Sequence, residues 1–125
     1  MSNAIAETPE VNGPASYIKI AEDYSRTPGG RKKVTGPFSG EEFREKLLVP
    51  HLKSALSGHG YVNVVLDGVA GYPVSFLEEA FGGLVRVDHF AKADLNNVLK
   101  ITANSGRFQT YSDLARRFIE TAENE

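Results

Sequence analysis

Ser75 is the residue whose type and position suggest the most specific chemistry. It follows the turn 71–74 and stands three residues before Glu78, and a Ser-x-x-Glu pattern predicts a helix that the serine hydroxyl caps. The start of a helix presents free amides and partial positive charge, so a phosphate is tolerated there. Such a phosphate adds a charge of about −1.5 to −2, which would repel an acidic partner. Ser75 is therefore either a cap alone or a regulatory contact.

A basic loop that contains glycine offers a second binding surface. Residues 22–38 show no periodicity, and loops longer than about 12–15 residues are usually functional or disordered. The residues of interest are Arg26, Gly29, Gly30, Arg31, Lys32 and Lys33. Glycine lets a backbone approach a phosphate closely, although the Gly-Lys-Ser/Thr ending of a phosphate-binding loop is missing. The loop either contacts a ligand or partner, or is a solvated charged loop.

The other titratable residues form no catalytic pattern. Asp67 ends an apolar segment at the sheet edge where ligands of open α/β sheets collect, but a carboxylate there also binds the amides of a turn. His51, His59 and His89 lack the spacing of metal ligands, and no nucleophile–base pair is evident. We therefore expect no enzymatic activity, no metal and no cofactor.

The composition restricts the class of protein. A chain of 125 residues normally forms one domain, and the absence of cysteine excludes disulfides, thiolate metal sites and cysteine nucleophiles. The formal net charge of −2 gives no overall attraction to nucleic acid or to an anionic membrane. The sequence has no apolar run of the roughly 18–20 residues that span a bilayer, and its polar start lacks the apolar core of a signal peptide. We expect a disordered segment over 1–15, one domain over 16–125, no membrane contact and a cytoplasmic location.

Three segments have the pattern of β-strands: Tyr17–Ala21, Val62–Asp67 and Val98–Thr102. The second is nearly continuous in apolar residues, which predicts a central strand that is covered on both faces.

Two Ser-x-x-Glu patterns predict the starts of helices. Ser39 with Glu42 begins a run that Pro50 is expected to kink or split near residue 48. Ser75 with Glu78 begins a second run. The residues expected on its inner face are Phe76, Leu77, Ala80, Phe81 and Leu84.

Two further helices complete the pattern. A short one is expected over 91–97, and Thr110 or Ser112 is expected to cap a last one. Strands therefore alternate with helices. This order predicts an α/β fold with a mainly parallel, mixed sheet of about four strands, joined by right-handed crossovers.

Several of these segments resemble a known family. They are a strand ending in Leu66-Asp67-Gly68, the stretch Ser75-Phe76-Leu77-Glu78-Glu79-Ala80-Phe81-Gly82 with Leu84, the loop Pro28-Gly29-Gly30-Arg31, and Gly36-Pro37-Phe38-Ser39-Gly40-Glu41 with Phe43-Arg44. They are similar to the STAS-like domains of unknown function, which are relatives of the anti-sigma factor antagonists. The likeness spans about 17–122 and implies a STAS-like fold.

The resemblance also implies a function. In the antagonists, an ATP-binding anti-sigma kinase phosphorylates a serine at the start of the helix after a central strand, and this breaks their complex. Ser75 falls at the matching position. The chain would then be a non-enzymatic regulatory domain, bacterial or from a phage, that docks a protein through 71–85. Contacts are expected from Tyr72, Pro73, Val74, Glu78, Glu79 and Arg86, with 26–33 supplementing them.

Two aromatic residues and the basic loop allow further interpretations. Tyr72 and Phe38 are candidates for exposed aromatic residues that anchor a partner, although aromatic residues in turns more often cover the edge of a core. The loop 26–33 would equally suit a nucleic-acid- or nucleotide-binding module, or a phage- or defence-related inhibitor that docks a nucleic-acid enzyme. Phosphate contacts make binding strongly salt-dependent, so charge reversal at Arg31 and Lys32 would distinguish these functions.

Overall fold

The computed structural model describes residues 15–124, so the predicted disordered segment 1–15 lies outside the described residues except for Ala15. In chain order the elements are β1 (Ala15–Lys19), α1 (Ile20–Asp23), a 3-10 helix (Lys33–Thr35), α2 (Gly40–Phe43), a π-helical turn (Arg44–Leu48), α3 (Val49–Gly58), β2 (Tyr61–Val65), α4 (Val74–Leu77), a second π-helical turn (Glu78–Gly82), α5 (Gly83–Arg86), α6 (Lys92–Val98), β3 (Leu99–Thr102) and α7 (Gly106–Thr121). Across these residues, no helix is both long enough and apolar enough to cross a membrane.

The strands form one parallel sheet in the order β1-β2-β3. Val64 of β2 lies opposite Ile18 of β1 and Ile101 of β3, so β2 is central as predicted. The α/β class is confirmed. The expected fourth strand is not found within residues 15–124, and the sheet there is purely parallel rather than mixed.

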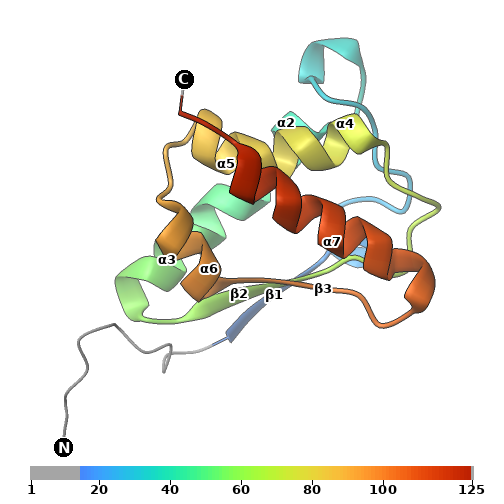
Figure 1. The fold of residues 1–125 in the computed structure, drawn as a ribbon. Coiled ribbons are helices and arrows are strands. Elements are labelled where there is room, and N and C mark those ends of the chain that lie inside the picture. The colour runs from blue at the N-terminus through green and yellow to red at the C-terminus, as the bar shows by residue number, and fades with distance from the viewer. Residues whose placement is uncertain (1–14, 125) are drawn as a thin grey trace, which may run out of the picture.

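The main helices lie on one face of this sheet (Figure 1). Right-handed crossovers that add strands in one direction return over the same face each time. Burial alternates accordingly, and Val62 and Val64 are buried while Tyr61, Asn63 and Val65 are half-exposed. The prediction that β2 is covered on both faces is therefore wrong.

Strand β1 ends two residues before its predicted end. The carboxylate of Asp23 accepts a hydrogen bond from the Lys19 amide at 2.8 Å, and Ile20 begins α1. The fully buried Ile20 side chain holds this turn against the core. The alternation that predicted a strand through Ala21 was thus overridden by local capping.

The first helical run begins as predicted. The Ser39 hydroxyl accepts a hydrogen bond from the Glu42 amide at 3.0 Å, which confirms Ser39 as an N-cap. The run passes through the π-helical turn 44–48 directly before α3, whose first turn contains Pro50. Proline provides no amide for the preceding turn, so the predicted interruption takes the form of a π-helical turn.

The last helix starts earlier than predicted. Helix α7 begins at Gly106 with Ser105 as its N-cap residue, so neither Thr110 nor Ser112 is a cap. The Ser112 hydroxyl instead donates to the Ile101 carbonyl oxygen at 2.8 Å and ties α7 to β3. The short helix expected over 91–97 is α6.

Candidate functional site

The helix that contains Ser75 begins at Pro73. Pro73 is the N-cap residue, and its carbonyl oxygen accepts hydrogen bonds from the amides of Phe76 at 3.0 Å and Leu77 at 3.3 Å. Ser75 therefore lies inside the first turn, and the prediction that it caps the helix with Glu78 is wrong. Within residues 15–124, the half-buried Ser75 hydroxyl has no hydrogen bond, so its oxygen is available for other chemistry.

Tyr72 is part of the core rather than of the surface. Its side chain is 5% exposed, its hydroxyl donates to the Leu66 carbonyl oxygen at 2.7 Å, and its ring packs edge-on against Tyr111. Burial raises the pKa of its hydroxyl. The expectation of an exposed Tyr72 is wrong because the turn 68–72 folds its aromatic residue inward over the end of β2. The predicted inner face of the helix, in contrast, is confirmed: Phe76, Leu77, Ala80, Phe81 and Leu84 are all buried.

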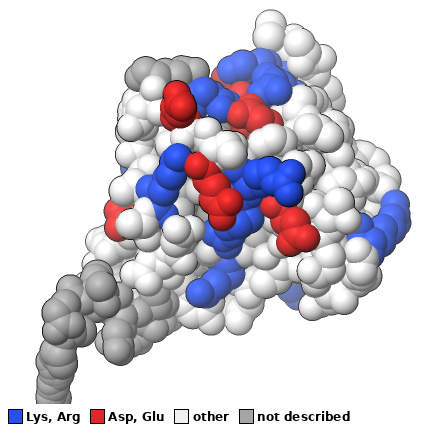
Figure 2. Space-filling model, viewed as in Figure 1, with Lys and Arg blue, Asp and Glu red and all other residues white. Residues whose placement is uncertain are grey.

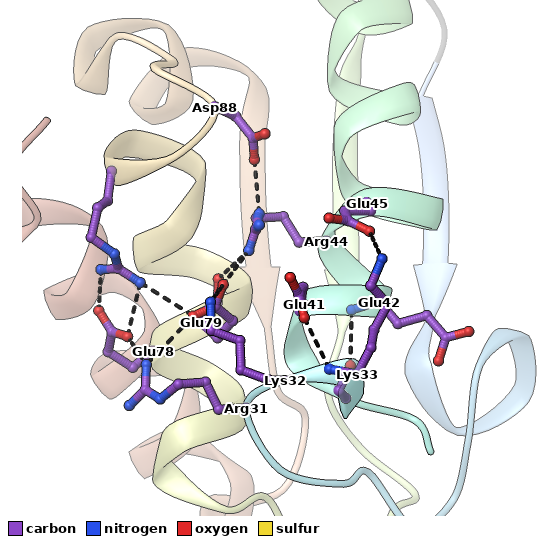
Figure 3. Close-up of polar contacts among 12 residues, drawn as sticks. Arg31, Lys32, Lys33, Glu41, Glu42, Arg44, Glu45, Glu78, Glu79 and Asp88 are labelled. Atoms are coloured by element: carbon purple, nitrogen blue, oxygen red, sulfur yellow. Dashed lines mark hydrogen bonds and ion pairs between the residues drawn. The ribbon is translucent and has the colours of Figure 1, made fainter. Parts of the chain in front are cut away.

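Glu78 joins the basic loop to this helix (Figure 3). It forms ion pairs with Arg31 from the loop and with Arg86 from α5, including an Arg86 Nη2 to Glu78 Oε1 distance of 3.0 Å. Burial opposes ionisation of Glu78, but the hydrogen bonds from Arg86 and Arg31 outweigh it and hold its pKa below the usual value. The basic loop and the helix that contains Ser75, which the sequence suggested as two separate surfaces, are therefore joined.

Glu79 is the centre of a buried ion pair. Its side chain and that of Arg44 are each 2% exposed, and Arg44 Nη1 lies 2.7 Å from Glu79 Oε2. Arg44 also donates to the Glu79 carbonyl oxygen at 3.1 Å and, through Nε, to Asp88 at 2.8 Å. Burial disfavours the charged form of Glu79, yet Arg44 keeps its pKa below the usual value. Glu79 is thus inaccessible to a partner, contrary to the prediction of a surface contact.

The glycine pair 82–83 makes room for these charges. A Cβ on Gly83 would lie 2.6 Å from Arg44 Nη1, and a Cβ on Gly82 would lie 2.9 Å from Glu78 Oε2. Two glycines weaken a helix by roughly 1 kcal/mol each. Here Gly83 leaves room for the Arg44 guanidinium, and Gly82 leaves room for the Glu78 carboxylate.

The loop is folded back on itself before it reaches the helix. The Gly29 amide donates to the Phe38 carbonyl oxygen at 2.7 Å, and the Gly40 amide donates to the Gly30 carbonyl oxygen at 2.9 Å. A Cβ on Gly29 would collide with the Pro37 carbonyl oxygen. The close backbone approach that glycine was expected to give a phosphate is used inside the loop.

The remaining loop cations also contact acidic residues. Lys32 Nζ lies 3.5 Å from Glu79 Oε2, and Lys33 Nζ lies 2.7 Å from Glu45 Oε1. Arg26 has no ion pair with any of residues 15–124. Most of the positive charge predicted to meet a ligand is thus balanced within the domain.

Apolar side chains of the same loop and of the start of the helix are exposed. Val34 is 90% exposed, Val74 58% and Phe38 41%, which confirms the expectation of an exposed Phe38. Phe38 has a φ of 57°, a backbone conformation that costs a residue with a side chain about 1–3 kcal/mol. We call the area formed by Arg31, Lys32, Val34, Phe38, Pro73, Val74 and Ser75 the loop–helix surface.

Asp67 has a structural role. Its carboxylate accepts hydrogen bonds from the amides of Asn104 at 2.8 Å and Ser105 at 3.1 Å. Burial opposes ionisation, but these amides lower its pKa below the usual value. His59 and His89 both adopt positive φ in turns. No group of three His, Asp or Glu side chains within the described residues is placed to hold a metal ion.

Sequence reasoning missed two arrangements. The first is the ion pair of Arg44, for which the only local signal is an arginine next to Phe43 in an apolar run together with a distant glycine pair. The second is a hydrogen bond of 2.5 Å between Ser16 Oγ and His51 Nδ1. Both link residues 35 apart along the chain, so no local pattern reveals them.

One of the comparisons with known proteins found a match. The family model of the STAS-like domain of unknown function (DUF4325) matches residues 39–106, from the Ser39 cap to the start of α7. The curated proteins gave no match, and neither did the solved structures. The matched region covers more than half of the chain and contains Arg44, Glu79 and the glycine pair. The chain therefore belongs to the family of STAS-like domains of unknown function.

Proposed function

We propose that this chain is a non-enzymatic regulatory domain that docks a partner protein through the loop–helix surface. The proposal rests on the ion pairs that join the loop to helix 74–86. They run from Arg31 and Lys32 of the loop to Glu78 and Glu79 of the helix. A surface built from two segments and fixed by charges is preorganised, which lowers the entropy lost on binding.

The composition of the surface favours a protein over nucleic acid. Val34, Phe38 and Val74 give it exposed apolar area, and its cations already have acidic partners. Figure 2 shows acidic and basic side chains interleaved on the face it draws, without a continuous basic area. Protein interfaces combine apolar contacts with a polar rim, whereas phosphate backbones require unneutralised cations.

Ser75 is the proposed phosphoacceptor on this surface. Its hydroxyl is unbonded within the described residues, and exposed Pro73 and Val74 precede it directly. A phosphate there would place a charge of about −1.5 to −2 beside the apolar Val74 and one turn from Glu78. An interface that buries Val74 would lose affinity on this modification. The family resemblance makes an ATP-binding kinase of the anti-sigma type the proposed partner.

Affinity capture with matched variants tests the docking surface. The tagged full-length chain, Val74→Asp and Lys100→Glu are incubated with nuclease-treated lysate of the native host, and captured proteins are identified by mass spectrometry. Lys100 is exposed on β3, in the sheet, and serves as the charge-changing control. The same partner should be captured by the wild type and Lys100→Glu and lost with Val74→Asp. Equal capture by Val74→Asp would contradict the proposal.

Charge reversal separates the nucleic-acid alternative. The wild type and the double variant Arg31→Glu/Lys32→Glu are compared for binding of nucleic acid at several salt concentrations. Salt-sensitive binding that the wild type shows and the variant lacks would favour the nucleic-acid alternative. Under the proposed function, the wild type shows no such binding.

A further inference from the structure

A cavity lies between β1 and α3, at the end of the sheet where β1 and β2 begin. It has a volume of about 440 Å³, and the residues that line it include Ser16, Pro50, His51, Ser54, Ala55 and Tyr61. They lie at the starts of β1 and β2 and on α3, whereas the loop–helix surface follows the ends of these strands (Figure 1). The cavity is therefore separate from the proposed docking surface.

The lining combines an apolar wall with one polar pair. Ala15, Pro50 and Ala55 provide apolar parts of the wall, and Ser16 Oγ lies 2.5 Å from His51 Nδ1. No Lys, Arg, Asp or Glu is among the described residues that line it. The described lining therefore has no permanently charged side chain to compensate a charged ligand for lost hydration. The cavity therefore selects against ions.

The Ser16–His51 pair leaves hydrogen-bonding capacity for a ligand. If the Ser16 hydroxyl donates to Nδ1, its oxygen lone pairs remain as acceptors and Nε2–H as a donor. If Nδ1–H donates to Ser16 Oγ, the hydroxyl hydrogen is left to donate. In both tautomers the pair presents a donor and an acceptor. A hydroxyl or a carbonyl group on a ligand can therefore form a hydrogen bond with the pair in either tautomer.

We propose that this cavity binds a small neutral molecule with an aromatic or aliphatic body and a single hydroxyl or carbonyl head group, anchored by Ser16 and His51. Ligand sites of about 300–1,000 Å³ with mostly apolar walls and a few placed polar groups are the usual form of small-molecule sites. The volume of about 440 Å³ lies in the lower part of this range and is large enough for a single ring.

Three probes of similar size test the proposal on the full-length chain by NMR titration and calorimetry. Phenol has the ring and the hydroxyl, toluene lacks the hydroxyl, and benzoate carries a charge. Phenol should bind with a Kd on the order of 1 mM or below, toluene several-fold more weakly and benzoate at least about tenfold more weakly. Saturable shifts of the amides of Ser16 and of Gly60, which also lines the cavity, should accompany phenol binding. No saturable shift there at about 10 mM phenol would overturn the proposal.

Two serines in the same cavity provide a matched pair of variants. Ser16 is bonded to His51, and Ser54 lines the cavity with no side-chain hydrogen bond to the described residues. Ser16→Ala should weaken phenol binding at least about fivefold while leaving toluene binding unchanged, and Ser54→Ala should change neither. Equal losses of phenol and toluene in Ser16→Ala, or a phenol loss of the same size in Ser54→Ala, would contradict the anchoring role. If Ser16→Ala does not fold, the three-probe ranking on the wild type decides.

Discussion

The chain contains the Ser-x-x-Glu pattern twice, and the two copies behave differently. We call residues 39–48 the first segment and residues 75–82 the second. Ser39 is fully buried and caps its helix, whereas the Ser75 hydroxyl is unbonded within the described residues. Both segments continue into a π-helical turn, and Arg44 of the first pairs with Glu79 of the second. The difference arises at Pro73, which starts the second helix two residues before its serine.

This difference separates a serine that serves the fold from one that is available to a partner. In the first segment the capping bond occupies the hydroxyl, and a modification would require the cap to break. In the second segment the helix already begins at Pro73. Modification of the Ser75 hydroxyl therefore does not remove a cap. The same local pattern thus gives a structural residue at one site and a candidate regulatory residue at the other.

Removal of the ion pair that joins the segments should have the largest effect. In Arg44→Ala, Glu79 remains buried without its guanidinium, and the loss of one partner of such a pair costs about 3–5 kcal/mol. Chemical denaturation at pH 7 measures the change in the free energy of unfolding. Arg117→Ala, an exposed position on α7, is the control. A change below about 1 kcal/mol in Arg44→Ala would show that the segments do not depend on this pair.

Ser39→Ala should have the next largest effect. The substitution leaves the Glu42 amide without its acceptor and opens a small void at a fully buried site. Loss of a serine cap costs about 0.5–2 kcal/mol, and burial favours the upper part of that range. The midpoint of urea denaturation reports it. An unchanged midpoint would mean that the first cap contributes as little as the second serine.

Acid should weaken the contact between the second segment and the loop. The pKa values of Glu78 and Glu79 are lowered in the folded state, because the hydrogen bonds from arginine outweigh burial. Their contribution to stability is therefore complete above the unfolded-state pKa of about 4.3 and is lost as the pH falls through the lowered values. In Glu78→Gln, the loss of stability between pH 7 and pH 3 should be smaller than in the wild type. An equal loss would contradict the role of Glu78.

Ser75→Ala should have the smallest effect on folding. No hydrogen bond of the hydroxyl is lost among the described residues, so the free energy of unfolding should change by less than about 0.5 kcal/mol. Denaturation side by side with Ser39→Ala makes the comparison direct. A destabilisation of about 1 kcal/mol or more would indicate that Ser75 is a cap after all.

The sequence predicted those features of the fold that depend only on residues close together along the chain. The Ser39 cap, the inner face of the second helix and the short helix α6 follow from patterns within a few residues. The Ser75 cap was predicted wrongly because a proline two residues earlier competed for the helix start. The inward position of Tyr72 depends on the core that surrounds it, which no turn pattern contains.

The contacts that define the site are not local. Arg44 meets Glu79 at a separation of 35 residues, and Arg31 meets Glu78 at a separation of 47. Periodicity places such residues on a helix face or in a loop, but only the packing of the two segments brings them together. The loop and the helix were for that reason predicted as two surfaces instead of one.

The affinity of the captured partner for Ser75→Asp relative to Ser75→Ala tests whether a charge at Ser75 controls docking. Both variants should retain the stability of the wild type, so that a difference in Kd reports the surface alone. We expect Ser75→Ala to bind like the wild type and Ser75→Asp to bind at least about tenfold more weakly, since a charge enters the interface beside Val74. Equal affinities of the two variants would contradict this expectation.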